Sequence, residues 1–496
     1  MKQGTKRTLS MILLSAMLAG TVSCGSGSGD TENTTTSGND SQPDITEPVD
    51  PIAEREAMDD ELPDITYDNA PFTIAVETDF AYTILQDEAS GDVIDDAIYM
   101  RNLAVEDRFK TELELVTGDH ASLSSKILNI VQSGDDSLDL CMTHVIQTGN
   151  LALNGLFVNW YDVPYVNFEK PWWSASNIEN MTVNNVCPLA VGDCVLSALI
   201  GTYCVLYNKR LAEDYNLGDI YGIVNDGKWT IDKALELTKD TYSDLNSNGE
   251  IDSEDFFGYV SIQFSPINAY LWAFGGHVLQ RSESDGIELV YHSEKTNDMV
   301  QKLCSFFHDN SGIYLYTTDA NYDFNFSVNC FKDGRAVFIN SLLGSTVVNL
   351  RDMKDDYGVI PYPKWDEAQE NYSTMVDGFH EVLCIPVTAP DLERSGIITE
   401  ALCAESYKKV MPAYYETALK TKYTRDNESI AMIDLVVNSR VFDLGYFYDG
   451  WKGASFIFER LVHDNNANFE SYWAANESSI TTHYQKVIDY FENYGE

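Results

Sequence analysis

Apolar and polar residues between positions 71 and 143 alternate between the periods of strands and of helices. "PFTIAVE" has the apolar, β-branched content of a buried strand, and after it Ile94, Ile98 and Val105 recur at helical spacing. The strand-like segments are 71–77, 112–116 and 138–143, and the helix-like segments are 93–109 and 123–133. This order predicts a parallel sheet with right-handed crossovers, in which ligands meet the loops beyond the carboxyl ends of the strands.

Mixed α/β character continues from about residue 164 to the end of the chain. "KWTIDKALELTKDTY" is typical of a helix capped by Thr230, "FKDGRAVFINS" of a turn and a strand, and "DGFHEVLCIPVTAP" of another strand. The last part of the chain is mostly amphipathic helix. A body running from residue 69 to residue 496 is too long for one ordinary domain, so the sequence predicts two lobes of about 200 residues each.

The first 23 residues have the form of an export signal. Three basic residues precede an apolar run from Leu9 to Ala19, which is too short to span a bilayer as a mature helix. The small residues before Cys24 resemble the lipobox of bacterial lipoproteins, in which the cysteine is lipidated and becomes the first mature residue. We therefore predict a signal peptide at 1–23 and a protein lipid-anchored at Cys24 on the extracytoplasmic face of the cell membrane. The alternative is an ordinary secretory signal in which the cysteine is incidental.

Residues 24–68 are rich in Gly, Ser, Thr, Asp and Pro, with few large apolar side chains. Such a composition buries too little surface to offset chain entropy, so we expect a disordered linker. The formal charge of the chain is −46, which makes nucleic acid and anionic lipid poor partners. The membrane contact is then the lipid anchor alone.

Eight cysteines follow Cys24, and they show no CxxC pairing. Several lie inside apolar runs, which indicates buried thiols and not the disulfide framework of a small domain. Cys187 and Cys194 are the pair we would first test for a bond.

Eight segments together resemble the bacterial extracellular solute-binding proteins of the carbohydrate-uptake group, the maltose-binding-protein-like family. They are "DDAIYMRNLAVEDRF", "SGDDSLDLCMT", "NGLFVNW", "VLYNKRLAEDYNL", "GKWTIDKALELTKD", "WAFGG", "FKDGRAVFIN" and "YGVIPYPKWDE". They occur in the order of the family and span nearly the whole body.

The resemblance implies an α/β protein with the two-lobe, type II periplasmic-binding-protein-like fold and a ligand cleft between the lobes. By analogy, the first lobe is 69–163 plus 374–440 and the second is 164–373 plus 441–496. It also implies a monomer that gives its solute to an ABC-type permease.

A sugar site needs flat aromatic rings for the apolar faces of the sugar and planar polar groups for its hydroxyls. Four tryptophans are candidates: Trp172 and Trp173 in a loop after the expected first crossing, Trp272 in the segment that matches the family, and Trp451 in a late aromatic cluster. The polar candidates lie at predicted strand ends and turns: Glu77, Thr143, His144, Asn340 and Asp377. The alternative for each aromatic is a core residue, and for Asn340 and Asp377 it is turn chemistry.

"DLNSNGEIDSED", residues 244–255, fits the pattern of a calcium loop, with alternate oxygen ligands and a glycine at the sixth position. The predicted ligands are Asp244, Asn246, Asn248, Glu250, Asp252 and Asp255. No second helix is predicted after the loop, so a bound calcium ion would be structural, and the alternative is a plain turn rich in Asp and Asn. No organic cofactor is expected.

The sequence thus predicts a substrate-binding lipoprotein of an ABC importer that binds a carbohydrate, in particular an oligosaccharide. It contains no G-x-S-x-G, phosphate-loop or HExxH motif, so we expect no enzyme activity. Three alternatives stay open: the same receptor with a non-sugar solute, a surface glycosidase, and a calcium-stabilised adhesin.

Overall fold

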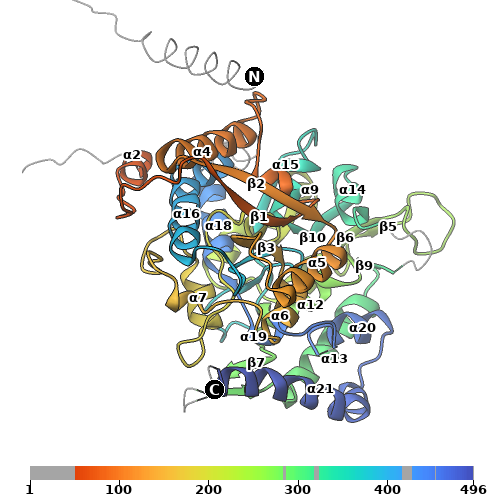
Figure 1. The fold of residues 1–496 in the computed structure, drawn as a ribbon. Coiled ribbons are helices and arrows are strands. Elements are labelled where there is room, and N and C mark those ends of the chain that lie inside the picture. Colours follow the sequence, from red (N-terminus) through yellow and green to blue (C-terminus); the bar gives the residue numbers. More distant parts are fainter. Residues whose placement is uncertain (1–50, 283–285, 318–322, 416–426, 453, 495–496) are drawn as a thin grey trace, which may run out of the picture. The chain divides into compact units, whose positions relative to one another are not determined.

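The computed structural model describes residues 51–496, apart from 283–285, 318–322, 416–426, 453 and 495–496 (Figure 1). The predicted signal peptide, Cys24 and the linker as far as residue 50 lie outside the described residues. Within the described part, no helix combines the length and the apolar character that crossing a bilayer needs.

The first sheet is formed by the predicted strand and helix alternation. Its strand order is β13-β3-β1-β2, with β1 parallel to both neighbours and β13 antiparallel to β3. The strands are β1 (Ala70–Glu77), β2 (Thr111–Gly118), β3 (Leu140–His144) and β13 (Glu381–Cys384), and the helices between the first three are α4 (Val93–Phe109) and α5 (His120–Ser133). Asp92 and Asp119 cap the two helices by accepting backbone N–H groups of their first turns.

The second sheet has the order β11-β4-β10-β6-β5, and β9 pairs with β6. Its strands are β4 (Tyr203–Asn208), β5 (Tyr242–Ser243), β6 (Phe256–Ile262), β9 (Ile313–Tyr316), β10 (Ala336–Leu342) and β11 (Tyr357–Ile360). Two small sheets pair β12 (Thr374–Met375) with β14 (Arg440–Val441) and β7 (Leu279–Arg281) with β8 (Ile287–Leu289). The β12 and β14 pair lies at the positions where we expect two of the crossings between lobes.

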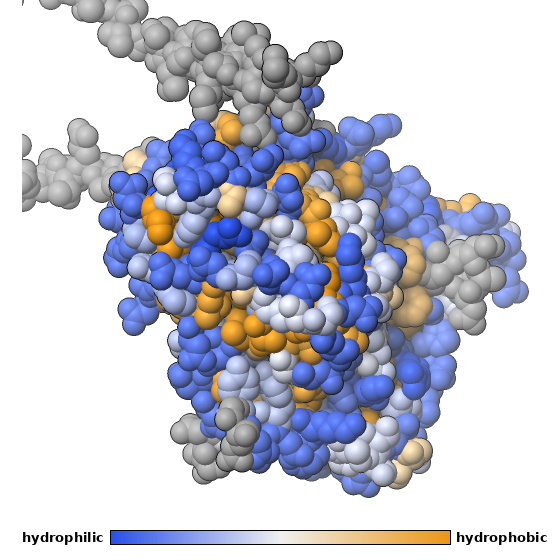
Figure 2. Space-filling view, viewed as in Figure 1, coloured by the Kyte–Doolittle hydropathy of each residue, from blue (hydrophilic) through white to orange (hydrophobic). Residues whose placement is uncertain are grey.

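Helices cover both sheets. In chain order they are α3 (Ala81–Ile84), α6 (Val145–Ala152), α7 (Ala175–Met181), α8 (Leu196–Ile200), α9 (Lys209–Asp214), α10 (Ile220–Asn225), α11 (Ile231–Thr238), α12 (Ser265–Ala273), α13 (Glu294–His308), α14 (Phe326–Lys332), α15 (Leu343–Val348), α16 (Leu392–Glu405), α17 (Met411–Ala413), α18 (Asn427–Asn438), α19 (Leu444–Phe447), α20 (Ile457–His463) and α21 (Phe469–Glu492). Short 3-10 and π turns are η1 (Trp160–Asp162) and η2 (Ser406–Val410). The face seen in Figure 2 is mainly hydrophilic, as the acidic composition leads one to expect.

The chain stays with the first sheet for longer than the sequence indicates. We expect the first crossing after residue 163, yet Trp172 and Trp173 donate their indole N–H groups to Glu400 of α16, and Ala190 forms a bridge with Leu383 of β13. Thr202 then bridges Val376, immediately before β4 begins. Residues 164–195 therefore pack on the side of the first sheet, because their apolar side chains are buried against β13 and α16.

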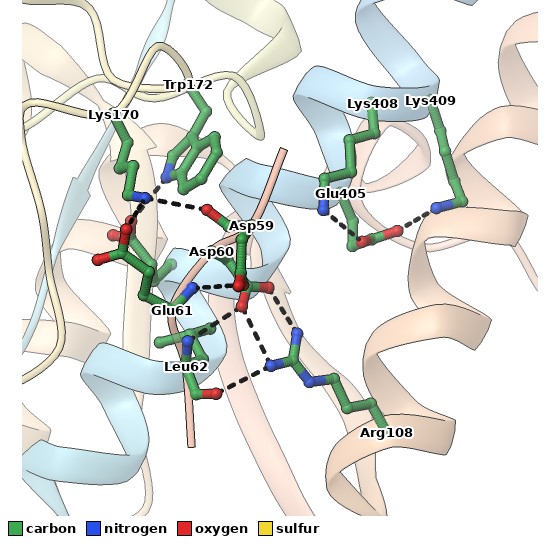
Figure 3. Close-up of polar contacts among 11 residues, drawn as sticks. Asp59, Asp60, Glu61, Leu62, Arg108, Lys170, Trp172, Glu405, Lys408 and Lys409 are labelled. Carbon is green, nitrogen blue, oxygen red and sulfur yellow. Dashed lines mark hydrogen bonds and ion pairs between the residues drawn. The ribbon is translucent and has the colours of Figure 1, made fainter. Parts of the chain in front are cut away.

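The folded body also begins earlier than predicted. Pro51–Glu56 form α2, and residues 57–68, here called the N-terminal strap, pack against the core. Figure 3 shows Asp60 of the strap bonded to Arg108 (2.5 Å) and Glu61 bonded to Lys170 (2.8 Å). The expected linker is therefore wrong for residues 51–68, because the few apolar side chains of the strap pack on the core and two of its acidic residues, Asp60 and Glu61, form ion pairs.

Candidate functional site

A cavity of about 330 Å³ lies at the ends of β6 and β10. Its wall also includes Tyr203 of β4, the turn before α14, and the loop that carries Asp377 and Phe379. This loop connects β12 with β13 of the first sheet. Two of the predicted site residues, Asn340 and Asp377, thus come together in one cavity.

Asp377 is held rigidly in this loop. Its carboxylate accepts the hydroxyl of Tyr203 at 2.6 Å and the backbone N–H of Phe379 at 3.0 Å. Its own N–H donates to the carbonyl of Gly201 at 2.8 Å. Burial raises the pKa of Asp377, although these hydrogen bonds oppose the change. Asp377 is the one Asp, Glu, Lys, Arg or His among the described residues that line the cavity.

Polar groups of β10 provide further hydrogen-bonding capacity in the cavity. Asn340 accepts the Tyr270 hydroxyl at 3.3 Å through its side-chain oxygen. The hydroxyl of Ser341 is buried and has no hydrogen-bond partner among the described residues. A buried hydroxyl without a hydrogen bond costs free energy. A polar solute that forms a hydrogen bond with Ser341 would remove this cost and would bind more tightly for that reason.

Three phenylalanines supply exposed or half-buried rings around the cavity. Phe324 is 68% exposed, and its ring lies 5.9 Å from that of Phe264 at an interplanar angle of 26°. Phe264 has a φ of +81°, a left-handed conformation that is strained for a residue with a side chain. Phe379 stacks on Phe80 of the first-sheet side, with centroids 5.5 Å apart. Apolar rings therefore stand beside the polar groups of the cavity.

The remaining polar candidates gather at the carboxyl edge of the first sheet. The backbone N–H of His144 donates to Glu77 at 3.1 Å, which joins the ends of β3 and β1. Thr143 is buried and shares a 2.6 Å hydrogen bond with Thr148. The ring of His144 lies 6.0 Å from that of Trp451, which is 52% exposed and stacks on Phe456. Of the four predicted tryptophans, Trp451 has the exposed face that stacking on a solute requires.

Burial sets the ionisation of this edge. It raises the pKa of Glu77, against the effect of the His144 N–H. Burial, together with the nearby His120 and His380, lowers the pKa of His144 to about 3. His144 is therefore neutral at physiological pH and can both donate and accept a hydrogen bond.

Three predicted platforms are core residues instead. Trp172 and Trp173 are buried, and their indole N–H groups donate to the two carboxylate oxygens of Glu400 at 2.7 and 2.9 Å. Trp272 is also buried and donates to Asp443 at 3.0 Å. The prediction that these three tryptophans line a cleft is wrong, because each indole is buried and donates its N–H to a buried carboxylate.

Five residues of the cavity wall are not among the predicted site residues: Phe264, Phe324, Phe379, Tyr203 and Ser341. Phe264 and Ser341 could have been predicted, because they lie at the carboxyl ends of β6 and β10, the position at which Glu77 was predicted. The other three follow no strand end and had no signal in the sequence.

The loop at 244–255 is organised by its own hydrogen bonds. The carboxylate of Asp244 accepts the N–H groups of Ser247 (2.6 Å) and Gly249 (2.9 Å), and the amide of Asn248 donates to Asp252 at 2.6 Å. Asn246 donates its amide to Asp252 as well. Among the described residues, no group of three or more His, Cys, Asp or Glu side chains is arranged to hold a metal ion.

Asp255, the twelfth residue of the loop, closes the loop through three hydrogen bonds. Its buried carboxylate accepts the Tyr242 hydroxyl (2.9 Å) and the N–H groups of Leu245 and Asp252 (both 3.1 Å). The carbonyl of Glu250 is also bonded to the Tyr242 hydroxyl, at 3.2 Å. These hydrogen bonds tie the loop to β5.

Calcium binding by this loop stays a prediction. We expect calcium at ten times its dissociation constant to add about 1.4 kcal/mol to the free energy of unfolding. Melting curves with calcium, with magnesium and with a chelator measure this effect, and a variant with Asp244→Asn and Asp252→Asn should lose it. A wild-type melting temperature that is the same with millimolar calcium and with chelator contradicts the prediction.

Solved structures with the same fold provide the comparison. The ABC substrate-binding protein Lmo0181 from Listeria monocytogenes, in complex with cycloalternan, matches with a TM-score of 0.54 at 10% identity over 85% of this chain and 99% of that chain. The GacH receptor of Streptomyces glaucescens, described in complex with acarbose, matches with 0.51 at 12% identity over 86% and 99%. A family 1 extracellular solute-binding protein from Bifidobacterium longum subsp. infantis matches with 0.53 at 11% identity over 84% and 99%.

The chain has the fold of the extracellular solute-binding proteins. The predicted fold class, α/β with the two-lobe, type II periplasmic-binding-protein-like arrangement, is thereby confirmed. A scan against protein-family models gives no match, and neither does a search of curated proteins.

Proposed function

We propose that this protein is the substrate-binding component of an ABC importer, which binds a carbohydrate and presents it to a membrane permease without changing it chemically. The observation that carries the proposal is the cavity of Asp377, Asn340 and Ser341, with the rings of Phe264 and Phe324 at its wall. Rings that stack on sugar CH groups and fixed polar groups that meet hydroxyls are what carbohydrate recognition needs. Two of the matching structures contain sugar-like ligands, cycloalternan and acarbose.

The position of the cavity suits a receptor that closes on its solute. Asp377 and Phe379 lie on the loop between β12 and the first sheet, whereas Asn340 and Ser341 belong to the second sheet. A solute that contacts both sets favours the conformation in which they approach each other. The permease can then distinguish the closed, liganded conformation from the empty one.

The charge of the site favours a neutral solute. Asp377 is the charged residue of the cavity wall, and the carboxylate of Glu77 lies at the first-sheet edge. A uronic acid or a sugar phosphate would bring a second negative charge next to a half-buried carboxylate, which is unfavourable. We therefore expect neutral oligosaccharides to bind and acidic ones to be rejected.

Melting temperatures of residues 51–496 across a panel of solutes test the proposal. The panel contains neutral oligosaccharides, uronic acid oligomers, amino acids and polyamines. A neutral oligosaccharide at a hundred times its dissociation constant should add about 2.7 kcal/mol to the free energy of unfolding. Stabilisation by amino acids or polyamines alone would overturn the carbohydrate assignment, and stabilisation by no solute would overturn the receptor.

We further propose that the chain is exported through the signal at 1–23 and held at the cell membrane by a lipid on Cys24. The composition of these residues supports this, and two acyl chains give stable anchoring. Replacement of Cys24 by Ser should release the protein into the medium. Retention of this variant in the membrane fraction would argue against the anchor.

Trp451→Ala should weaken binding of the oligosaccharide found in the panel by about tenfold, because loss of one stacked ring costs on the order of 1 to 1.5 kcal/mol. Titration calorimetry measures the change. Trp365→Ala is the matched control, since Trp365 packs against Phe274 and Lys302 on another part of the surface. Equal affinities of wild type and Trp451→Ala would remove Trp451 from the site.

A further inference from the structure

Two buried thiols lie in contact although they are distant in sequence. The Sγ atoms of Cys194 and Cys403 are 3.3 Å apart, with 209 positions between them along the chain. The expected partner of Cys194 is Cys187, but the thiol of Cys187 instead donates to the carbonyl of Leu189. All eight cysteines of the described residues are free and buried in this structure.

Little movement separates this contact from a covalent bond. A disulfide needs about 2.05 Å between its sulfurs, so the two atoms must approach by roughly 1.3 Å, which a side-chain rotation can supply. Gly192 leaves space for the sulfur of Cys403, since a Cβ at that position would lie 2.6 Å from it. Cys403 lies near the end of α16, and Cys194 lies just before α8.

A buried arginine lies on α4, the helix that packs against α16. Arg101 of α4 is buried, and its guanidinium donates to Asn102 and to the Ser406 hydroxyl. Burial lowers the pKa of Arg101 to about 10, while Cys194 and Cys403 act to raise it. Burial and the neighbouring Cys194 raise the pKa of the Cys403 thiol well above its usual value, so the thiolate that attacks a disulfide forms more readily while the chain folds, before this thiol is buried.

We propose that Cys194 and Cys403 form a disulfide bond when the chain folds outside the cytoplasm, a setting that rests on the proposed export. The oxidant is a small-molecule or protein disulfide. One cysteine thiolate attacks it and releases the first thiol, and the second cysteine then attacks the mixed disulfide and releases the other thiol. Two cysteine S–H bonds are lost, one S–S bond is exchanged, and both protons end on the two thiols of the reduced oxidant.

The bond would tie α16 to the segment that leads into β4. α16 packs beside α4 on the side of the first sheet (Figure 1), and residues 196–200 are the last before the chain enters the second sheet. Closure of so long a loop restricts the unfolded chain strongly. The first-sheet side would then be stabilised without any contact to the solute.

Peptide mapping of the exported full chain tests the proposal. Cells are harvested into denaturant with an alkylating agent, so that free thiols are blocked before they exchange. We expect one linked pair of peptides, containing Cys194 and Cys403, and alkylation of the other six cysteines after Cys24. Alkylation of Cys194 and Cys403, or a link between any other pair, would overturn the proposal.

Refolding separates this proposal from the proposed function. Purified full chain refolded in a glutathione redox buffer should form the same bond, whether or not it is exported or binds sugar. Reduction should then lower the melting temperature by about 3 to 5 °C. Cys194→Ser should remove this sensitivity to reductant, whereas the control Cys187→Ser should retain it. If both variants respond to reductant as wild type does, or if neither wild type nor Cys187→Ser responds, the bond is absent.

Discussion

Asp377→Asn should weaken binding of the oligosaccharide by about 10-fold to 100-fold. The substitution keeps one oxygen, which can still accept the backbone N–H of Phe379, and the new amide group can donate to the hydroxyl of Tyr203, so the fold around the loop should hold. It removes the charge and one acceptor position, and a hydrogen bond to a charged group is worth about 1.5 to 3 kcal/mol. Titration calorimetry with wild type and variant measures the loss.

A matched control distinguishes this effect from a change of surface charge. Asp366→Asn alters an exposed carboxylate that accepts the N–H groups of Ala368 and Gln369 in a turn. It should bind the oligosaccharide as wild type does. An Asp377→Asn protein with wild-type affinity and an unchanged melting temperature would mean that the cavity is not where the solute binds.

Glu400→Ala should lower the free energy of unfolding by about 4 kcal/mol, because two buried indole N–H groups lose their acceptor, at about 1 to 3 kcal/mol each. The groups are those of Trp172 and Trp173, and Glu400 is fully buried between them and Asn167. Urea unfolding followed by tryptophan fluorescence measures the loss. Glu236→Ala is the control, since Glu236 is exposed and pairs with Lys233 of the same helix, so its removal should cost less than about 1 kcal/mol.

The stability of the wild type should also depend on pH through Glu400. Burial raises its pKa to about 7, against the hydrogen bonds from the indoles. Because the folded pKa exceeds that of the unfolded chain, the folded state holds the proton more tightly, and stability should fall as pH rises from about 4.5 to 7. Glu400→Ala should lack this part of the pH dependence. A loss below about 1 kcal/mol, or an identical pH profile, would contradict the role assigned to Glu400.

The local part of the fold was predictable from the sequence. The expected segments 71–77 and 93–109 correspond to β1 and α4 almost residue for residue, because the first is a short apolar run and the second begins after the capping Asp92 and buries Ile98 and Val105 at helical spacing. Thr230 caps α11 as expected, by accepting the N–H of Lys233. The order of the parallel strands could also be predicted, because right-handed crossovers between strands and helices allow few arrangements.

The tryptophans show where such reasoning stops. Trp172, Trp173, Trp272 and Trp451 look alike in sequence, and their separation into three core residues and one exposed ring depends on Glu400 and Asp443. Those partners lie between 171 and 228 positions away in the chain. No local pattern contains that information, because long-range packing decides which polar group an indole meets.

The N-terminal strap was missed for a related reason. The average composition of residues 57–68 is acidic, and an acidic average predicts disorder. The fold uses single residues: Asp60 is buried against Arg108, and Leu62, Ile65 and Tyr67 pack on the core. A few side chains with specific partners outweigh an average that favours disorder.

A crystal structure of residues 51–496 with the oligosaccharide found in the melting panel tests the central claim most directly. We expect a sugar ring to fill the cavity at Asp377, Asn340 and Ser341, with a face against Phe264 or Phe324. Its hydroxyls should bond the Asp377 carboxylate and the hydroxyl of Ser341. Sugar bound elsewhere, with this cavity empty, would contradict the account.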